Sequence, residues 1–75
     1  MSRRKRTHVV CLTNEGYASS LEARKIYVAL ADAEAEREGF VRVVDESGED
    51  YLYPRERFAP IELPRRIAKA FSAST

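Results

Sequence analysis

Two residues whose side chains act as nucleophiles, bases or metal ligands occur once each in this chain, His8 and Cys11. An imidazole can activate a thiol as a nucleophile, and both groups bind zinc. Three positions apart on a strand, however, the two side chains point to opposite faces, and a closed zinc site needs about four ligands. We therefore expect a buried thiol and a histidine at the rim of the domain, with no metal site, no cofactor and no catalytic residue.

Acidic residues cluster around one expected turn, at Asp45, Glu46, Glu49 and Asp50. Clustered carboxylates can bind calcium, but this set lacks the alternating ligand order and the length of a calcium-binding loop. The glycines stand far apart from one another, so none belongs to a phosphate-binding loop. A solvated hairpin is the simpler interpretation of the acidic segment.

Tyrosines provide the strongest candidate for a binding surface. One alternating set of strand residues is aliphatic, namely Ile26, Val28, Leu30 and Leu52. If this set faces the core, the neighbouring Tyr27, Tyr51 and Tyr53 face the opposite side of the sheet. With further residues they would form an amphipathic surface typical of interfaces. The predicted binding residues are Tyr17, Tyr51, Tyr53, Pro54 and Arg57, with Arg55 beside them. Alternatively, the tyrosines cap the open ends of a small barrel, with their hydroxyls in water.

The net charge of +1 hides an uneven distribution, because both ends of the chain are basic and the stretch from Asp32 to Asp50 is acidic. Basic ends can contact phosphates while tyrosines stack on unpaired bases, so nucleic-acid binding is an alternative function. The basic residues concerned are Arg3, Arg4, Lys5, Arg6, Arg65, Arg66 and Lys69. The acidic middle and a pI of 7.9 weigh against nucleic acid, and a solvated tail is the simpler interpretation of the N-terminus.

Length and composition indicate the class of protein. A chain of 75 residues, 44% hydrophobic and 33% charged, has room for one small globular domain with a thin core. The apolar stretch 27–31 is too short to span a membrane, and no secretory leader is evident. The single cysteine cannot form an internal disulfide, which indicates a reducing cytoplasm.

The elements that would position these residues follow from the apolar pattern. A first strand is expected over 7–13, ending at a turn that contains Gly16. Residues 20–38 are ambiguous, because their composition favours one helix whereas the alternation in 24–30 favours a strand. We favour the strand, followed by a helical turn over 32–38 that Asp32 caps.

The second half of the chain predicts a hairpin and a closing strand. Strands are expected over 40–45 and 50–53, joined by a turn in which Gly48 adopts a positive φ. Pro54 ends the second strand, a single helical turn follows over 55–58, and a short strand covers 60–63. Pro64 then begins a terminal helix on which Ile67 and Phe71 share one face. Five short strands predict a mainly β fold, a small and strongly bent barrel.

The segment from Pro54 to Leu63, after the Gly48 hairpin, resembles the end of a Src-homology-3 (SH3) barrel. In that fold a proline, a single helical turn and a short closing strand follow the distal hairpin. A wider pattern in 20–22, 25–27, 42–54 and 61–64 resembles a set of small uncharacterised bacterial proteins, which have no function to transfer. The resemblance implies an SH3-like five-stranded barrel. The chain contains no tryptophan, on which the groove of peptide-binding members depends, so proline-rich peptides are not the expected ligands.

These patterns together predict a basic tail at 1–6, an SH3-like barrel at 7–63, and a C-terminal helix with a frayed end at 64–75. We expect a non-enzymatic interaction or regulatory module that binds a protein or peptide through its tyrosines. One alternative is nucleic-acid binding. The other is a self-associating structural protein, a homodimer in which Ile67 and Phe71 pack on a neighbouring copy. No membrane partner is expected.

Overall fold

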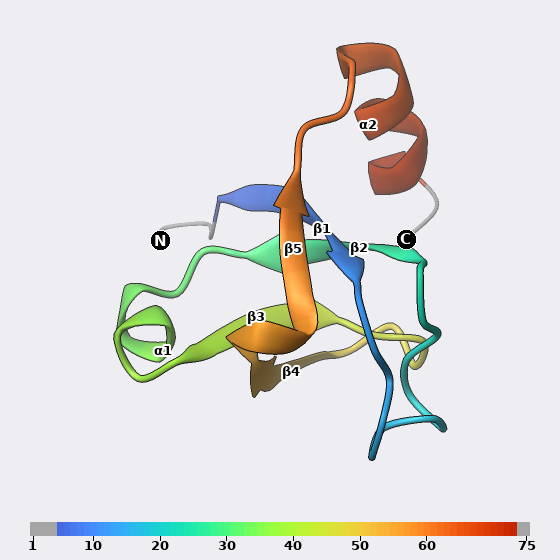
Figure 1. Cartoon of the computed structure of the whole chain (residues 1–75). Coiled ribbons are helices and arrows are strands. Elements are labelled where there is room, and N and C mark those ends of the chain that lie inside the picture. The colour runs from blue at the N-terminus through green and yellow to red at the C-terminus, as the bar shows by residue number, and fades with distance from the viewer. Residues whose placement is uncertain (1–4, 74–75) are drawn as a thin grey trace.

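An antiparallel sheet dominates the computed structural model, which describes residues 5–73 apart from the side chains of residues 68 and 71–73 (Figure 1). The strand order in the sheet is β4-β3-β2-β1-β5. In chain order the elements are β1 (Arg6–Cys11), β2 (Ile26–Leu30), α1 (Ala33–Arg37), β3 (Phe40–Val44), β4 (Asp50–Pro54), the 3-10 helix η1 (Arg55–Arg57), β5 (Phe58–Ile61) and α2 (Arg65–Ala73). The described part of the chain is therefore mainly β, with two short α-helices.

The ambiguous stretch 20–38 folds as strand β2 followed by helix α1, so the single-helix alternative is wrong. The backbone enters β2 through Arg24, whose φ is 64° and whose N–H donates to Cys11 O. From there β2 pairs with β1 on one side and with β3 on the other, which no helix could do. The predicted cap of α1 is confirmed, because Asp32 Oδ1 accepts from the Ala35 N–H at 3.1 Å.

The predicted hairpin is also confirmed. β3 pairs with β4, with Val41 opposite Tyr53, and Gly48 in the turn has a φ of 86°. The closing strand β5 begins at Phe58, two residues before the predicted 60–63, because the Phe58 side chain enters the core and its backbone pairs with Cys11. The helical turn of η1 between β4 and β5 is correspondingly short.

The core cluster lies on the face of the sheet opposite to the predicted one, although Val28, which was predicted to face the core, is also buried, at 7% exposed. Its buried residues are Val9, Cys11, Leu21, Tyr27, Ala29, Val43, Tyr53 and Phe58. Tyr27 and Tyr53 are 6% and 4% exposed, whereas Leu52 is 45% exposed. The prediction that these two tyrosines face away from the core is therefore wrong. Alternation correctly placed the strand tyrosines and the aliphatic strand residues on opposite faces of the sheet. It did not decide which of the two faces is buried, because a tyrosine can be buried when its hydroxyl has a hydrogen-bond partner.

The sheet is open, with β4 and β5 as its two edges. Figure 1 shows the terminal helix α2 beyond the end of β5 and far from α1. On this predicted helix Ile67 is 45% exposed, and the side chain of Phe71 lies outside the described residues, so their shared face stays a prediction. Among the described residues, no helix has both the length and the apolar character to cross a membrane.

Candidate functional site

Three of the predicted binding residues come together in space: Tyr17, Tyr53 and Arg57. The Tyr17 ring stands edge-on to the Tyr53 ring, with 5.0 Å between ring centroids and 83° between ring planes. The Arg57 guanidinium lies over the Tyr17 ring, 5.3 Å from its centroid. The β1–β2 loop, β4 and η1 each contribute one member. We call this group of Tyr17, Tyr53 and Arg57 the aromatic platform.

The β1–β2 loop, residues 12–25, positions Tyr17 through its own turns. The Tyr17 N–H donates to Asn14 O at 2.8 Å, and the Tyr17 carbonyl accepts from the N–H groups of Ser20 and Leu21. Gly16 has a φ of 86°, which allows the turn before Tyr17. Leu21, only 1% exposed, anchors the loop in the core. The half-buried Tyr17 ring is therefore held by ordered backbone on both sides.

Arg57 connects this loop to η1. Its Nη1 donates to Glu15 O at 2.6 Å, and its own carbonyl accepts from the Leu12 N–H at 2.8 Å. Its Nε is buried and has no hydrogen-bond partner in the described part of the chain. A cation over an aromatic face gains more when it is partly removed from water. Arg57 therefore holds the β1–β2 loop against η1 by hydrogen bonds and places a positive charge beside Tyr17.

Tyr53 is the buried member of the aromatic platform and lies in the hydrophobic core against Tyr17. Its hydroxyl donates to Asp45 Oδ2 at 2.6 Å and lies 3.1 Å from Ser20 Oγ. Asp45 is 6% exposed and also accepts from the N–H and hydroxyl of Ser47. Burial alone would raise the pKa of Asp45, but the hydrogen bonds from Ser47 and Tyr53 outweigh burial and lower that pKa. Burial and the Asp45 carboxylate raise the pKa of Tyr53, which keeps its hydroxyl a donor.

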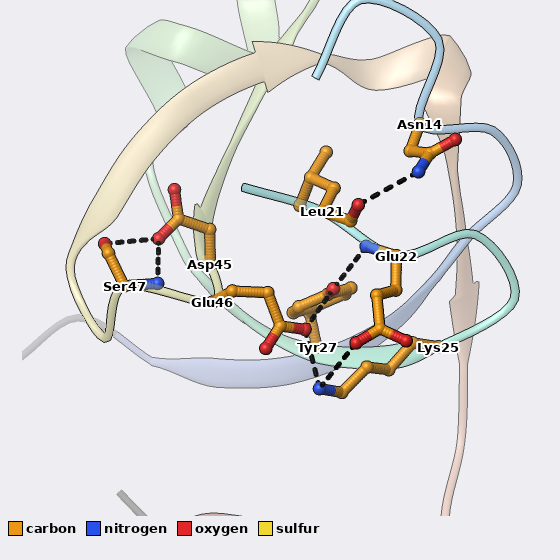
Figure 2. Close-up of polar contacts among 8 residues, drawn as sticks. All are labelled: Asn14, Leu21, Glu22, Lys25, Tyr27, Asp45, Glu46 and Ser47. Carbon is orange, nitrogen blue, oxygen red and sulfur yellow. Dashed lines mark hydrogen bonds and ion pairs between the residues drawn. The ribbon is translucent and has the colours of Figure 1, made fainter. Parts of the chain in front are cut away.

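The next acidic residue, Glu46, forms a second tyrosine–carboxylate pair with Tyr27 (Figure 2). Tyr27 Oη donates to Glu46 Oε2 at 2.6 Å and accepts from the Glu22 N–H at 2.7 Å, while Lys25 Nζ lies 2.6 Å from the same Oε2. Lys25 and then Tyr27 lower the pKa of Glu46. Burial and then the bond to Glu46 raise the pKa of Tyr27. The hydroxyls of Tyr27 and Tyr53 thus link the β1–β2 loop and its neighbours to the β3–β4 turn.

The other predicted binding residues lie elsewhere on β4. Tyr51 is 49% exposed and donates its hydroxyl to the Glu49 carboxylate at 2.9 Å. Pro54 is half-buried opposite Phe40, on the face of β4 that points away from the core. The single tyrosine surface predicted from the sequence is therefore divided into buried, half-buried and exposed parts.

Sequence reasoning missed a third ring, Phe58, which packs on Tyr53 with 6.0 Å between centroids and 60° between planes. It also missed Asp45, which appeared only as part of a solvated acidic hairpin. Phe58 follows η1, where the alternation of β4 no longer applies, and the pairing of Asp45 with Tyr53 needs the folded hairpin. No local pattern would have found either residue.

The single histidine and cysteine lie on opposite faces of β1, as predicted, since Cys11 faces the core and alternation turns His8 away. Cys11 is a free thiol with 0% exposure, and its Sγ donates to Thr13 O at 3.3 Å. Burial raises the pKa of this thiol. A buried thiol of raised pKa is a poor nucleophile at neutral pH.

Of the residues predicted for nucleic-acid binding, Arg3 and Arg4 lie outside the described residues. The others are exposed, namely Lys5, Arg6, Arg65, Arg66 and Lys69. The described part of these two basic segments is therefore accessible to a polyanion.

A cavity of about 190 Å³ opens on the core side of the sheet. Apolar side chains from β1, β2, β3 and β5 line it, and Arg55 and Glu36 lie at its polar side. Arg55 Nη1 donates to Glu36 O at 3.5 Å. The cavity borders the edge strand β5 and is separate from the aromatic platform.

No family model, curated protein or solved structure matches the chain. The aromatic platform is therefore the feature of the described residues that bears most directly on function.

Proposed function

We propose that this protein is a non-enzymatic interaction module that binds a protein or peptide segment through the exposed side of the aromatic platform. The observation that carries the proposal is the stack of the Arg57 guanidinium over Tyr17, itself braced by the buried Tyr53. Tyrosine and arginine are the residue types that contribute most to binding when they are well packed. Because the loop is ordered by its own hydrogen bonds, little conformational entropy would be lost on binding.

We also propose that the fold is SH3-like. The strand order β4-β3-β2-β1-β5, the 3-10 helix between β4 and β5, and a long loop after β1 support this proposal. In the barrels that the sequence resembles, that loop folds over one side of the binding surface. The likeness concerns the arrangement of elements, and such folds carry many activities. The free thiol of Cys11 is our reason for proposing a cytoplasmic location.

The side chains of the aromatic platform indicate which chemical groups a partner segment should present. The Tyr17 ring is half-buried, and the Arg57 guanidinium lies over it. Arg57 Nη1 already donates a hydrogen bond to Glu15 O. A fitting segment presents an apolar side chain to the ring and a carbonyl or carboxylate oxygen to the remaining guanidinium N–H groups. Tyr53 contributes by supporting Tyr17, since its own ring is buried.

A display screen of random peptides against the intact chain tests this proposal. Peptides selected on the wild type should lose about tenfold or more in affinity for Tyr17→Ala. The matched control is Ile67→Ala on α2, which removes another partly exposed side chain outside the platform and should leave affinity unchanged. The proposal is wrong if selected peptides bind Tyr17→Ala as well as the wild type, or shift NMR signals only elsewhere.

Nucleic-acid binding is the second candidate, favoured by the exposure of the basic residues in 5–6 and 65–69. A salt titration separates the two functions. Binding of a random oligonucleotide through phosphates should weaken steeply between 50 and 200 mM salt, by about a thousandfold for some six phosphate contacts. Binding of a peptide at the platform should change far less over the same range.

A further inference from the structure

The two edges of the sheet differ in the backbone groups that they expose. The Leu12 N–H donates to Arg57 O, and the same register continues along β5. In an antiparallel pair this alternation turns the backbone groups of Phe58 and Pro60 away from β1. The Phe58 N–H donates to Arg55 O, and Pro60 has no N–H. Within the described chain, the outer edge of β5 therefore presents no free donor, as a protected edge should.

The outer edge of β4 is not protected in this way. The Arg55 N–H donates to Gly39 O and the Asp45 N–H donates to Glu49 O, each at 3.0 Å, which fixes the alternation along β4. The residues whose backbone groups point outward are Asp50, Leu52 and Pro54. Among residues 5–73, no partner is found for the N–H groups of the first two or for the carbonyl of Leu52.

Exposed apolar side chains accompany these free groups. Leu52 is 45% exposed and Phe40 is 38% exposed, both on the face of the sheet that points away from the core. Between them Arg42 is neutralised by Asp32 Oδ2 at 2.8 Å and Asp50 Oδ2 at 3.0 Å. The edge thus combines unpaired backbone groups with a partly apolar surface, the combination that promotes strand pairing between molecules.

We propose that β4 pairs antiparallel with β4 of a second copy of this chain, with Leu52 opposite Leu52 of that copy. The two Leu52 residues then exchange N–H and C=O bonds, and each Asp50 N–H donates to Pro54 O of the other copy. The missing N–H of Pro54 does not weaken this pairing, because only the carbonyl of Pro54 takes part in it. The pairing joins two sheets into one and leaves the aromatic platform out of the interface, so it goes beyond the proposed function.

Charge complementarity selects both the second copy and the register. Glu49 precedes β4 and Arg55 follows it, and both are exposed. In the proposed register Glu49 of each copy lies opposite Arg55 of the other, which stabilises the pair at both ends. A shift that places Tyr51 opposite Tyr51 would instead bring the two Asp50 side chains to diagonal positions, where like charges repel.

Sedimentation equilibrium over a wide range of protein concentration tests the pairing. The wild type should dimerise reversibly, and Leu52→Lys should raise the dimer dissociation constant by about tenfold or more, because a lysine blocks edge pairing. The matched control Leu12→Lys makes the same change at a side chain that is 53% exposed in the β1–β2 loop, and it should leave the constant unchanged. Circular dichroism at low concentration should show both variants folded.

A charge exchange tests the register. Glu49→Arg and Arg55→Glu should each weaken self-association, because each places like charges opposite one another, and an equimolar mixture should recover a mixed dimer. Hydrogen exchange of the Leu52 N–H should slow as wild-type concentration rises. The proposal is overturned if the wild type stays monomeric up to about 1 mM, if Leu52→Lys dimerises as well as Leu12→Lys, or if the mixture stays monomeric.

Discussion

Tyr51 and Tyr53 lie on the same strand and point to the same side of the sheet, yet Tyr51 is 49% exposed and Tyr53 only 4%. Tyr53 is covered by Tyr17 from the β1–β2 loop and by Phe58 from β5. The contact found for the Tyr51 hydroxyl is the nearby Glu49, at the solvent side of the turn. Strand alternation assigns a residue to a face, but segments distant in sequence decide whether that position is covered.

The polar atoms of the two tyrosines differ as well. The Tyr53 hydroxyl bonds a buried carboxylate in a region of low dielectric, whereas the Tyr51 hydroxyl bonds an exposed one in water. The two hydrogen bonds therefore differ in their contribution to stability, because only the buried one leaves an unsatisfied group when it is broken.

Truncation of the two rings should give the largest difference. Tyr53→Ala removes a buried ring and the donor to Asp45, so the free energy of unfolding should fall by about 3–5 kcal/mol, enough to unfold a thin-cored domain near room temperature. Tyr51→Ala should leave the urea midpoint close to that of the wild type. Comparable losses for the two variants would contradict the assignment of Tyr53 to the core.

Removal of the hydroxyls alone should give a smaller difference. Tyr53→Phe keeps the ring but takes a donor from the buried Asp45 carboxylate, which should cost about 1–3 kcal/mol in urea unfolding. Tyr51→Phe is the control, and its stability should match that of the wild type. If both variants unfold at the wild-type midpoint, the Asp45 bond does not stabilise the fold.

Acid should weaken the two tyrosine–carboxylate pairs. The pKa values of Asp45 and Glu46 lie below their ordinary 3.8 and 4.5 in the folded protein. Each therefore contributes stability that is present above the ordinary pKa and is lost as pH falls through the lowered one. Thermal melts should show a decline below about pH 4.5. The combined Asp45→Asn and Glu46→Gln variant should show a flatter acid decline, and an unchanged profile would contradict the pairs.

The smallest effect is expected at Lys25, whose side chain is 44% exposed and whose partner Glu46 is 32% exposed. Lys25→Met should barely change the melting temperature, because exposed ion pairs contribute little. Carboxyl NMR titration should still detect the loss, as a rise in the pKa of Glu46 toward its ordinary 4.5. A pKa of Glu46 that does not move would show that Lys25 is not its partner.

Local signals were reliable where the chemistry is local. Asp32 caps α1, Gly48 takes the positive φ of the hairpin turn, and alternation identified β2 inside a helix-like composition. Of the predicted site, Tyr17 and Arg57 do meet, but Tyr51 and Pro54 lie apart from them. Contacts between residues about 40 positions apart, such as Tyr17 with Arg57, depend on how the loop crosses the sheet, and no periodicity carries that information.

By itself the sequence determined the order of strands and helices along the chain, the turns, and the two alternating sets of side chains, because backbone dihedrals and nearest neighbours govern these features. Only the tertiary structure decided which set forms the core, which tyrosines are covered, and which sheet edge keeps free donors. Those outcomes depend on the burial of hydroxyls against Asp45 and Glu46 and on the pairing of distant strands. They are properties of the assembled sheet, because a residue is buried by segments that are distant from it in the sequence.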